Sequence, residues 1–215
     1  MDQKTFFLDA SQALQQLFDD SFVTQRLTAG ETLFEQDDHD DRLYVLDEGL
    51  LEVSVYSEGG RKLSLNLLRA GSVFGEIAMF DPGPRTAGIS AVEDCKLRAI
   101  SQATVIKGIE TAPHLAAELL SFAGKRMRWL SQQVEEQVFM TPTARLASKV
   151  IYLAGENGEI AMSQAQLADY VGVTREVVSK NLAEWQREGL VSLSRGRLRL
   201  VDANALENLR KTNFL

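Results

Sequence analysis

The hydrophobic pattern of this chain changes its period once, and the change limits the folds it can adopt. Residues 22 to 100 break into short segments in which apolar and polar side chains alternate, as in half-buried strands. From Pro113 the apolar residues recur at helical spacing, and the next proline is Pro142. Strands followed by helices predict an α+β chain with a β-rich first part and a helical second part.

The strand-like region suggests a small β-roll, with jelly-roll-like architecture, after an initial helix from Asp9 to about Phe18. Leu51, Val53 and Val55 alternate with Glu52, Ser54 and Tyr56, and Leu63, Leu65 and Leu67 alternate with Ser64 and Asn66. We therefore expect these apolar side chains to be buried and the polar ones between them to face solvent. Glycine-containing turns at residues 29–31, 47–49, 58–60 and 70–72 separate the segments.

The helical run from residue 113 to 140 carries two apolar faces. One has the alternating spacing of three and four residues that marks the seam of a two-stranded coiled coil. Its members are Ala116, Leu120, Ala123, Met127, Leu130 and Val134. Leu119, Phe122 and Trp129 lie off this seam and can pack on the helix's own domain. Against the alternative of a plain amphipathic core helix, the two faces favour a dimerisation helix in a homodimer.

Residues 141–215 have the pattern of a winged helix-turn-helix. Thr141 and Pro142 start a helix, and Ser163 with Gln166 forms a capping box that opens another. A turn at 171–173 contains Gly172, and Thr174 can cap the following helix to about Glu188. Residues 190–193 and 198–201 then form a hairpin, the wing. With the long helix, this predicts a sensor domain at 1–112, a dimerisation helix at 113–140 and a DNA-binding domain at 141–215.

Charge is distributed unevenly between these parts. The chain has 215 residues and a net charge of -7. Residues 1–140 carry 13 basic and 22 acidic residues, net -9, whereas residues 141–215 carry 10 and 8, net +2. Six basic residues against three acidic ones lie between Arg175 and Arg199. Such a patch is either a solvated surface or a site for nucleic acid, and the sequence motifs around it distinguish the two.

Composition argues against several other classes of protein. No apolar run is long enough to span a bilayer, and the first residues lack the features of a secretory signal. A lone Cys95 excludes a disulfide within the chain and fits a reducing cytoplasm, where a buried free thiol is the plain interpretation. His39 and His114 are too few and too far apart for a histidine-built metal centre, so we expect no metal.

A candidate phosphate-binding segment lies between the predicted roll strands. Gly75 allows the backbone to approach an anion, the turn at 76–79 can present free N–H groups, and Arg85 offers a fork of donors. Glu76 can bind a ribose hydroxyl instead. No core packing is expected to depend on the Arg85 charge, so replacing Arg85 by Leu should remove ligand binding and leave the fold. The candidate ligand-binding residues here are Phe74, Gly75, Glu76, Ile77, Ala78, Arg85, Thr86 and Ala87.

A second candidate site lies at the start of the second helix of the helix-turn-helix. This end of a recognition helix reads base edges, where Arg can pair with guanine and Glu can accept from cytosine. Structural salt bridges are the alternative role for Arg175 and Glu176. The candidate DNA-binding residues are Thr174, Arg175, Glu176, Ser179 and Lys180, with Arg195, Arg197 and Arg199 of the wing.

These motifs resemble those of a known family. The segment FGEIA followed by PRTA resembles the phosphate-binding cassette of cyclic-nucleotide-binding domains, and a degenerate cassette that binds nothing is the alternative. The resemblance implies Gly75 and Glu76 at the ribose, and Arg85 and Thr86 at the cyclic phosphate. With Arg175-Glu176 and Lys180, the whole order of parts is similar to the cyclic-AMP receptor protein and fumarate-nitrate regulator (Crp/Fnr) family of bacterial transcription regulators.

That resemblance implies a homodimer on two-fold symmetric double-stranded DNA with half-sites related to TGTGA and TCACA, contact with RNA polymerase, and cyclic AMP as effector. Two departures limit the transfer. The family's adjacent Thr and Ser, which contact adenine across the dimer, align with Leu130 and Ser131, so of this pair only Ser131 remains a candidate ligand-binding residue. The loop at residues 155–162 is shorter than the family's polymerase-contacting loop, which leaves the mode of that contact open.

The sequence therefore predicts a ligand-responsive, dimeric DNA-binding regulator and no enzyme. One alternative keeps the architecture without a ligand, so that the abundance of the protein controls its activity. The other, an enzyme or kinase-regulating subunit that uses the roll as a module, is remote because no nucleophile-base pair stands out and residues 141–215 are fully used by the winged helix.

Overall fold

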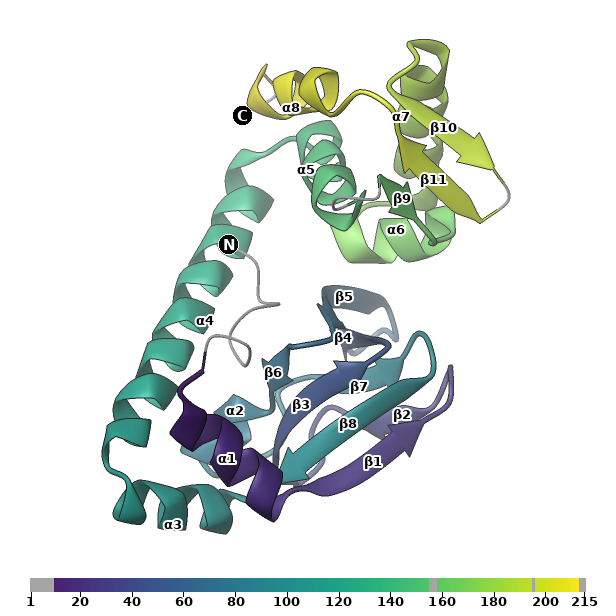
Figure 1. The fold of residues 1–215 in the computed structure, drawn as a ribbon. Helices are drawn as coiled ribbons and strands as arrows, with labels where there is room; N and C mark the ends of the chain where they lie inside the picture. The colour runs from purple at the N-terminus through teal and green to yellow at the C-terminus, as the bar shows by residue number, and fades with distance from the viewer. Residues whose placement is uncertain (1–9, 155–157, 195, 213–215) are drawn as a thin grey trace. The chain divides into compact units, whose positions relative to one another are not determined.

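A computed structural model describes residues 10–154, 158–194 and 196–212 (Figure 1). The contacts between residues divide the chain into two compact units, Met1–Trp129 and Leu130–Leu215, with the boundary inside one long helix. The three-part division expected from the sequence stays a proposal. Each unit is described by itself.

The first unit contains two four-stranded sheets with antiparallel pairing. One sheet has the order β1-β8-β3-β6 and the other the order β2-β7-β4-β5. The first consists of β1 (Val23–Leu27), β8 (Cys95–Ile100), β3 (Leu43–Glu48) and β6 (Val73–Phe74). The second consists of β2 (Thr32–Phe34), β7 (Gly88–Ala91), β4 (Leu50–Tyr56) and β5 (Lys62–Arg69). Apart from the β4-β5 hairpin, strands next to one another in each sheet are not consecutive in the sequence, as expected of a roll.

Strand β3 supplies both cores of this unit because its side chains alternate between two covered faces. Tyr44 and Leu46 belong to an apolar cluster built from both sheets. Leu43 and Val45 belong to a second cluster, in which the other face of the sheet packs against helices. The buried Cys95 thiol lies in the first cluster, where burial raises its pKa.

Four helices contribute to the second cluster, and Figure 1 shows α1, α3 and the start of α4 gathered at one side of the unit. They are α1 (Gln12–Ser21), α2 (Glu76–Phe80), α3 (Gln102–Thr111) and α4 (His114–Phe139). Serine side chains cap two of them, since Ser11 Oγ accepts from Leu14 N–H and Ser101 Oγ from Thr104 N–H. Helix α1 begins at Gln12, later than the sequence suggested, and Asp9 lies outside the described residues. Helix α3 was not expected from the sequence.

The expected burial is wrong for Ser54 of β4, which is buried, and for much of β5. Ser64 and Asn66 of β5 are buried, whereas Leu65 is 39% exposed. The pairing of β4 with β5 passes from Val53–Asn66 to Ser54–Ser64, which leaves Leu65 as an extra residue. Such a bulge disturbs the alternation of faces, and a period-two argument cannot foresee it.

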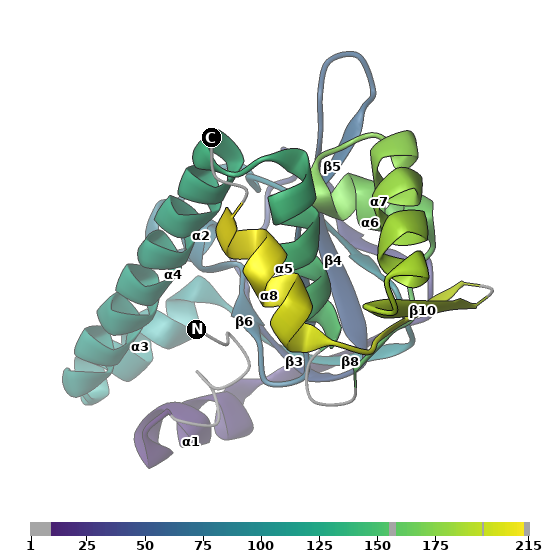
Figure 2. The same ribbon diagram turned by 90° about the horizontal axis from the view of Figure 1, so that it is seen from above.

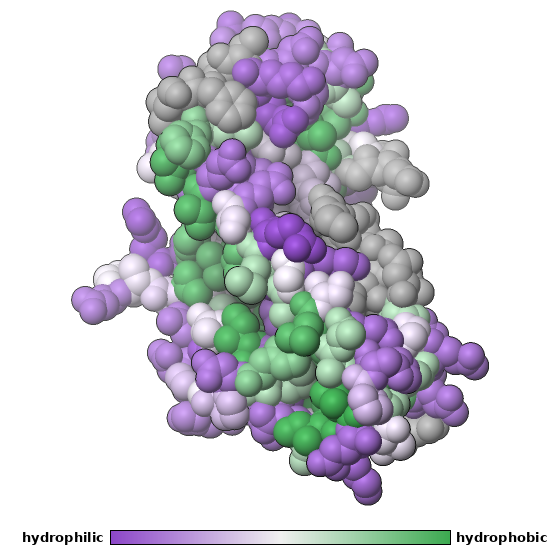
Figure 3. Space-filling view, turned by 90° about the vertical axis from the view of Figure 1, so that its left-hand side faces the viewer, coloured by the Kyte–Doolittle hydropathy of each residue, from purple (hydrophilic) through white to green (hydrophobic). Residues whose placement is uncertain are grey.

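Helix α4 runs unbroken for 26 residues and separates its two apolar faces as expected. Leu119 and Phe122 are buried in the second cluster. Seam residues Leu120 and Met127 are each 68% exposed, and apolar patches are visible on the face of the molecule along α4 (Figure 3). Leu130, Val134 and the nearby Val138 are exposed as well. The exposed row of apolar side chains lies on one helix face, at the spacing expected of a seam.

The second unit contains the end of α4 and the expected helix-turn-helix. Its helices are α5 (Pro142–Ala154), α6 (Gln164–Val171), α7 (Arg175–Arg187) and α8 (Ala203–Thr212), and its strands are β9 (Glu159–Ile160), β10 (Val191–Ser194) and β11 (Arg197–Leu200). Figure 2 shows α8 alongside α5, in agreement with their contacts. Strands pair in the order β10-β11-β9. Strand β9 and helix α8 were not expected.

The local signals in this unit are confirmed. Thr141 Oγ1 accepts from the N–H of Ala144 at 3.2 Å, and Ser163 with Gln166 forms the capping box in both directions. Gly172 takes the left-handed conformation, with φ of 74°, at the end of α6. None of the helices in the described residues combines the length and apolar character needed to cross a membrane.

Candidate ligand pocket and DNA-binding face

A pocket in the first unit collects every residue of the cassette that the sequence singled out. Its walls come from β6, α2, the segment before β7, and single residues of other elements. The lining residues are Phe34, Val53, Phe74, Gly75, Glu76, Ile77, Ala78, Arg85, Thr86, Ala87, Ile89 and Arg126. Arg85 is 3% and Glu76 5% exposed, so a basic and an acidic side chain of the pocket lie out of solvent, and a second basic residue, Arg126, is half-buried. Thr86 is exposed and Ile77 is 44% exposed.

Gly75 precedes α2 in a conformation that a side chain would strain. Its φ is 90°, and a Cβ at this position would lie 2.6 Å from the carbonyl oxygen of Arg42 and 2.9 Å from Nη1 of Arg85. Glycine therefore allows the Arg85 guanidinium to lie against the backbone. Nη1 of Arg85 donates to the carbonyl of Gly75 at 3.0 Å.

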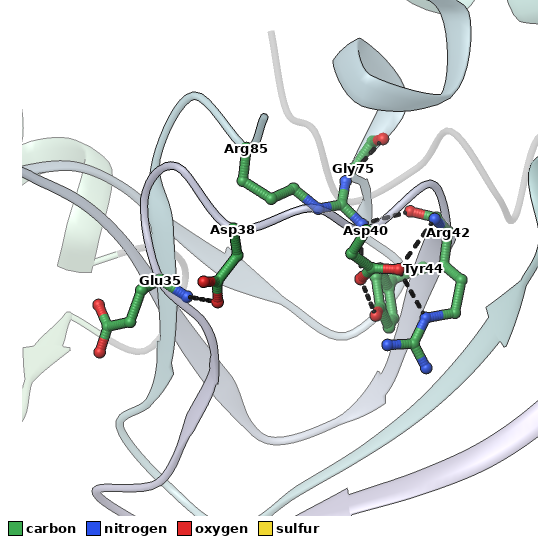
Figure 4. A network of polar contacts seen from close by, with 7 residues as sticks. All are labelled: Glu35, Asp38, Asp40, Arg42, Tyr44, Gly75 and Arg85. Atoms are coloured by element: carbon green, nitrogen blue, oxygen red, sulfur yellow. Dashed lines mark hydrogen bonds and ion pairs between the residues drawn. The ribbon is translucent and has the colours of Figure 1, made fainter. Parts of the chain in front are cut away.

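The Arg85 guanidinium is engaged by the segment 40–42 (Figure 4). Its Nη2 donates to Oδ2 of Asp40 at 2.9 Å and to the carbonyl of Arg42 at 2.7 Å. The guanidinium carbon lies 4.3 Å from the ring centre of Phe34. The expectation that no core packing depends on the Arg85 charge is therefore wrong: the buried guanidinium packs on the core residue Phe34 and joins an ion pair between segments 45 residues apart.

Besides Arg85, two residues donate to Asp40, and the backbone N–H of Arg42 is one of the donors, at 3.2 Å from Oδ1. Arg42 Nε donates to Oδ1 at 2.7 Å, and the Tyr44 hydroxyl donates to Oδ2 at 2.6 Å. Burial alone would raise the pKa of Asp40, but the hydrogen bonds from Arg42, Tyr44 and Arg85 lower it far below its usual range. Burial and the bond to Asp40 raise the pKa of Tyr44. Asp40 is thus an anion bound to Arg85, which lines the pocket.

Glu76 is also paired, with a residue that the sequence analysis missed. Nε of Arg126 on α4 lies 3.4 Å from Oε1 of Glu76, and the Arg126 guanidinium carbon is 4.7 Å from the ring centre of Trp129. Arg126 occurs on the helix face of Phe122 and Trp129, which is otherwise apolar. A single charged residue on an otherwise apolar, core-facing side of a helix was the sequence signal that could have identified Arg126. The pair connects the pocket to α4.

The start of α7 exposes the residues chosen as base readers. Thr174, Arg175, Glu176, Ser179 and Lys180 are all exposed, while Val178, Leu182 and Trp185 hold the opposite face of the helix in the core. Thr174 caps the helix through the N–H of Val177. Hydrogen bonds from its own N–H and from the Thr174 hydroxyl lower the pKa of Glu176. The Glu176 carboxylate therefore also helps to cap the helix.

On the wing, Arg197 and Arg199 of β11 are exposed and alternate with the buried Leu198. Nη1 of Arg197 lies 4.0 Å from a carboxylate oxygen of Glu159 on β9, a long and exposed contact of little energetic weight. Arg195 lies outside the described residues.

Two family models match the chain. A model of the cyclic nucleotide-binding domain matches residues 24–111, and a model of the Crp-like helix-turn-helix domain matches residues 144–209. The first match contains the pocket cassette and the second contains the recognition helix. The chain belongs to the Crp/Fnr family of bacterial transcription regulators.

Relatives of this Crp/Fnr protein match along most of their length. A CRP-like cAMP-activated global transcriptional regulator of Mycobacterium tuberculosis is 26% identical over 186 residues, 82% of this chain and 83% of the relative. A cyclic AMP receptor protein of Thermus thermophilus is 29% identical over 192 residues, 88% of this chain and 89% of the relative. The chain is therefore a transcription regulator with a cyclic-nucleotide-binding domain and a DNA-binding helix-turn-helix.

A solved structure supports the fold of this family member. The c-di-GMP-responsive global regulator CLP of Xanthomonas campestris has a TM-score of 0.78 at 20% identity, covering 89% of this chain and 100% of the other. At this identity the likeness concerns the fold alone.

One candidate ligand residue of this Crp/Fnr chain belongs to the other unit. Ser131 is exposed on α4, directly after Leu130, and belongs to the second unit. Its role at a ligand stays a prediction.

Proposed function

We propose that this regulator is a cytoplasmic homodimer that binds a cyclic purine nucleotide, cyclic AMP first of all, and that this ligand controls its binding to a two-fold symmetric operator. The observation that carries the proposal is the pocket, where Arg85, Glu76 and the left-handed Gly75 lie together. A cyclic nucleotide offers one phosphate anion, a ribose hydroxyl and an apolar purine face. The pocket offers a cation, a carboxylate and a wall of Phe34, Phe74 and Ile89.

Each group in the pocket has a task in this proposal. The Arg85 guanidinium binds the cyclic phosphate, aided by the Thr86 hydroxyl, and Glu76 accepts a hydrogen bond from the ribose. Arg126 links Glu76 to α4 through their ion pair, so a ligand that bonds to Glu76 also acts on the helix. A ligand controls DNA binding only if it binds the DNA-competent arrangement better than the other.

The dimer is formed by the exposed apolar row of α4. Leu120, Met127 and Val134 are each more than 60% exposed, which is unusual for large apolar side chains spaced along one helix face. A second copy of the same helix buries this face in a parallel coiled coil. Two recognition helices then address half-sites about 34 Å apart, one turn of DNA.

At the DNA, Arg175 reads a guanine and Glu176 a cytosine, while Ser179 and Lys180 complete the exposed face of α7. Arg197 and Arg199 of the wing contact phosphates, which adds affinity without sequence preference. RNA polymerase is the further partner of a regulator of this family.

One observation favours a second candidate, a regulator that needs no ligand. Arg85 already has an anionic partner in Asp40. If this pair is permanent, the cassette serves only the fold, and the abundance of the protein sets its activity.

Titration calorimetry with cyclic AMP and cyclic GMP separates the two. We expect the wild type to bind a cyclic nucleotide and Arg85→Leu to lose about 100-fold or more in affinity, since hydrogen bonds to a charged group contribute about 1.5–3 kcal/mol each. The matched control is Arg98→Leu. Arg98 is also part-buried and paired with aspartates, Asp47 and Asp19, but it does not line the pocket.

Arg98→Leu should lower stability and keep the ligand. Gel-shift titrations of operator DNA with and without the nucleotide then test whether the ligand changes the affinity for DNA. The ligand-free regulator is supported if the wild type binds neither nucleotide and its DNA affinity is high and the same with and without nucleotide.

A further inference from the structure

The Arg85 guanidinium is only partly available to a ligand. Three hydrogen bonds tie its two terminal nitrogens to Asp40, to the Arg42 carbonyl and to the Gly75 carbonyl. Nε of Arg85 is buried and has no hydrogen-bond partner among the described residues. A phosphate can therefore bind at Nε while Asp40 stays, or it can displace Asp40 from Nη2.

Asp40 is placed beside Arg85 by the backbone. The N–H of Asp37 donates to the carbonyl of Arg85, and the N–H of Arg85 donates to the carbonyl of Asp38, both at 2.8 Å. These bonds fix the 37–42 segment along the cassette, and Figure 4 shows the Asp40 carboxylate between Arg85, Arg42 and Tyr44. If Arg85 moves to a ligand, Asp40 keeps the donors of Arg42 and Tyr44, so the exchange leaves no bare buried carboxylate.

We propose that Asp40 is an internal counter-ion of Arg85 and competes with the phosphate of the ligand. A ligand then binds only if its contacts other than the phosphate contribute enough free energy to overcome this competition. The inference rests on the proposed function of this pocket as a cyclic-nucleotide site. An anion that offers charge alone, such as inorganic phosphate, gains little because Arg85 is already neutralised. A nucleotide that also bonds Glu76 and covers the apolar wall overcomes the competition.

The opposite role, in which Asp40 orients Arg85 for the ligand, is less consistent with the contacts. Without Asp40, the Gly75 and Arg42 carbonyls and the face of Phe34 still hold the guanidinium. The contribution that only Asp40 makes is its negative charge, close to where a phosphate must bind. Two anions in a part-buried site repel each other more strongly than they would in water.

The two roles predict opposite signs for Asp40→Asn. As a counter-ion, Asp40 weakens binding, so Asp40→Asn should bind cyclic AMP about tenfold more tightly in calorimetry of the full-length protein. The same variant should unfold at a lower temperature without ligand, because the Arg85 ion pair is lost. If Asp40 were merely structural, Asp40→Asn would lower stability without tightening the binding of cyclic AMP.

Two further variants complete the design. Asp41→Asn removes the same charge from the neighbouring, exposed residue and should change the affinity less than twofold. Asp40→Glu restores the carboxylate and should return the affinity toward that of the wild type. Titration with inorganic phosphate should give no measurable binding to the wild type and measurable binding to Asp40→Asn.

The outcomes separate this inference from the function on which it rests. If the wild type binds cyclic AMP and Asp40→Asn binds it equally or more weakly, the counter-ion role is wrong and the effector assignment stands. Binding by Asp40→Asn alone supports both. If neither protein binds cyclic AMP or cyclic GMP, the effector assignment is wrong and the counter-ion role is rejected with it.

Discussion

A buried ion pair joins the end of α4 to α5 within the second unit, and the free-energy cost of removing it can be predicted. Nζ of Lys149 on α5 donates to Oε2 of Glu136 on α4 at 3.0 Å and to the side chain of Gln133. Lys149 is 8% and Glu136 9% exposed. Replacing Lys149 by Met keeps most of the volume and leaves the Glu136 carboxylate buried without its cation.

The expected cost follows from this geometry. At 3.0 Å and an effective dielectric constant of about 20, the attraction between the two charges is about 5 kcal/mol. Loss of one partner of a buried pair costs about 3–5 kcal/mol, because the remaining charge stays out of water. Loss of both partners removes the buried charge as well, so Lys149→Met with Glu136→Leu should lie within about 2 kcal/mol of the wild type.

Urea unfolding followed by tryptophan fluorescence measures this cost. Trp185 is 2% exposed in the same unit, and a Trp129→Phe background makes it the one reporter. The matched control is Lys211→Met. Lys211 is 63% exposed and lies 3.6 Å from Glu207, and its loss should cost about 0.5 kcal/mol or less. A cost below about 1 kcal/mol for Lys149→Met, equal to the control, would refute the reasoning.

Two further predictions concern DNA and the dimer. Arg175→Ala should lose about 1–3 kcal/mol of binding free energy on the specific operator and relax the preference at one base pair. Arg199→Ala should weaken binding to all DNA sequences alike and lower the dependence of the affinity on salt concentration. Full operator discrimination by Arg175→Ala in gel-shift titrations contradicts the first expectation. Leu130→Thr should raise cyclic-AMP affinity by up to about tenfold, through a restored hydroxyl, and weaken the dimer in sedimentation; an unchanged or lower affinity rejects this role.

The parts that could be predicted from the sequence are those whose signals are local. A capping box such as Ser163 with Gln166 and a left-handed Gly172 depend on neighbouring residues, so a single sequence contains what is needed to locate them. The apolar row of α4 follows from periodicity in the same way. Helix α8 was not predicted, although Ala203, Leu206 and Leu209 recur at helical spacing and Leu206 is fully buried.

The unpredicted parts depend on contacts between distant segments. The bulge at Leu65 exists only in the pairing of β5 with β4, and no residue type announces it. The partners of the two charged pocket residues are equally remote: Asp40 precedes Arg85 by 45 residues, and Arg126 follows Glu76 by 50. A motif identified Arg85 and Glu76 but contained nothing about the groups that neutralise them.

The partners of Arg85 and Glu76 bear on which nucleotide the pocket accepts. A regulator described as c-di-GMP-responsive shares this fold with a TM-score of 0.78, while relatives in sequence are described as cAMP-activated. A common cassette can present the same cation and carboxylate to any nucleotide that carries a phosphate and a ribose. Discrimination must then come from what surrounds the two groups. In this chain Asp40 is paired with Arg85 and Arg126 with Glu76, so a nucleotide meets two charged groups that already have partners. On the proposed function, changing Asp40 or Arg126, which lie outside the cassette, should alter the affinity for the ligand while the recognisable motif stays the same.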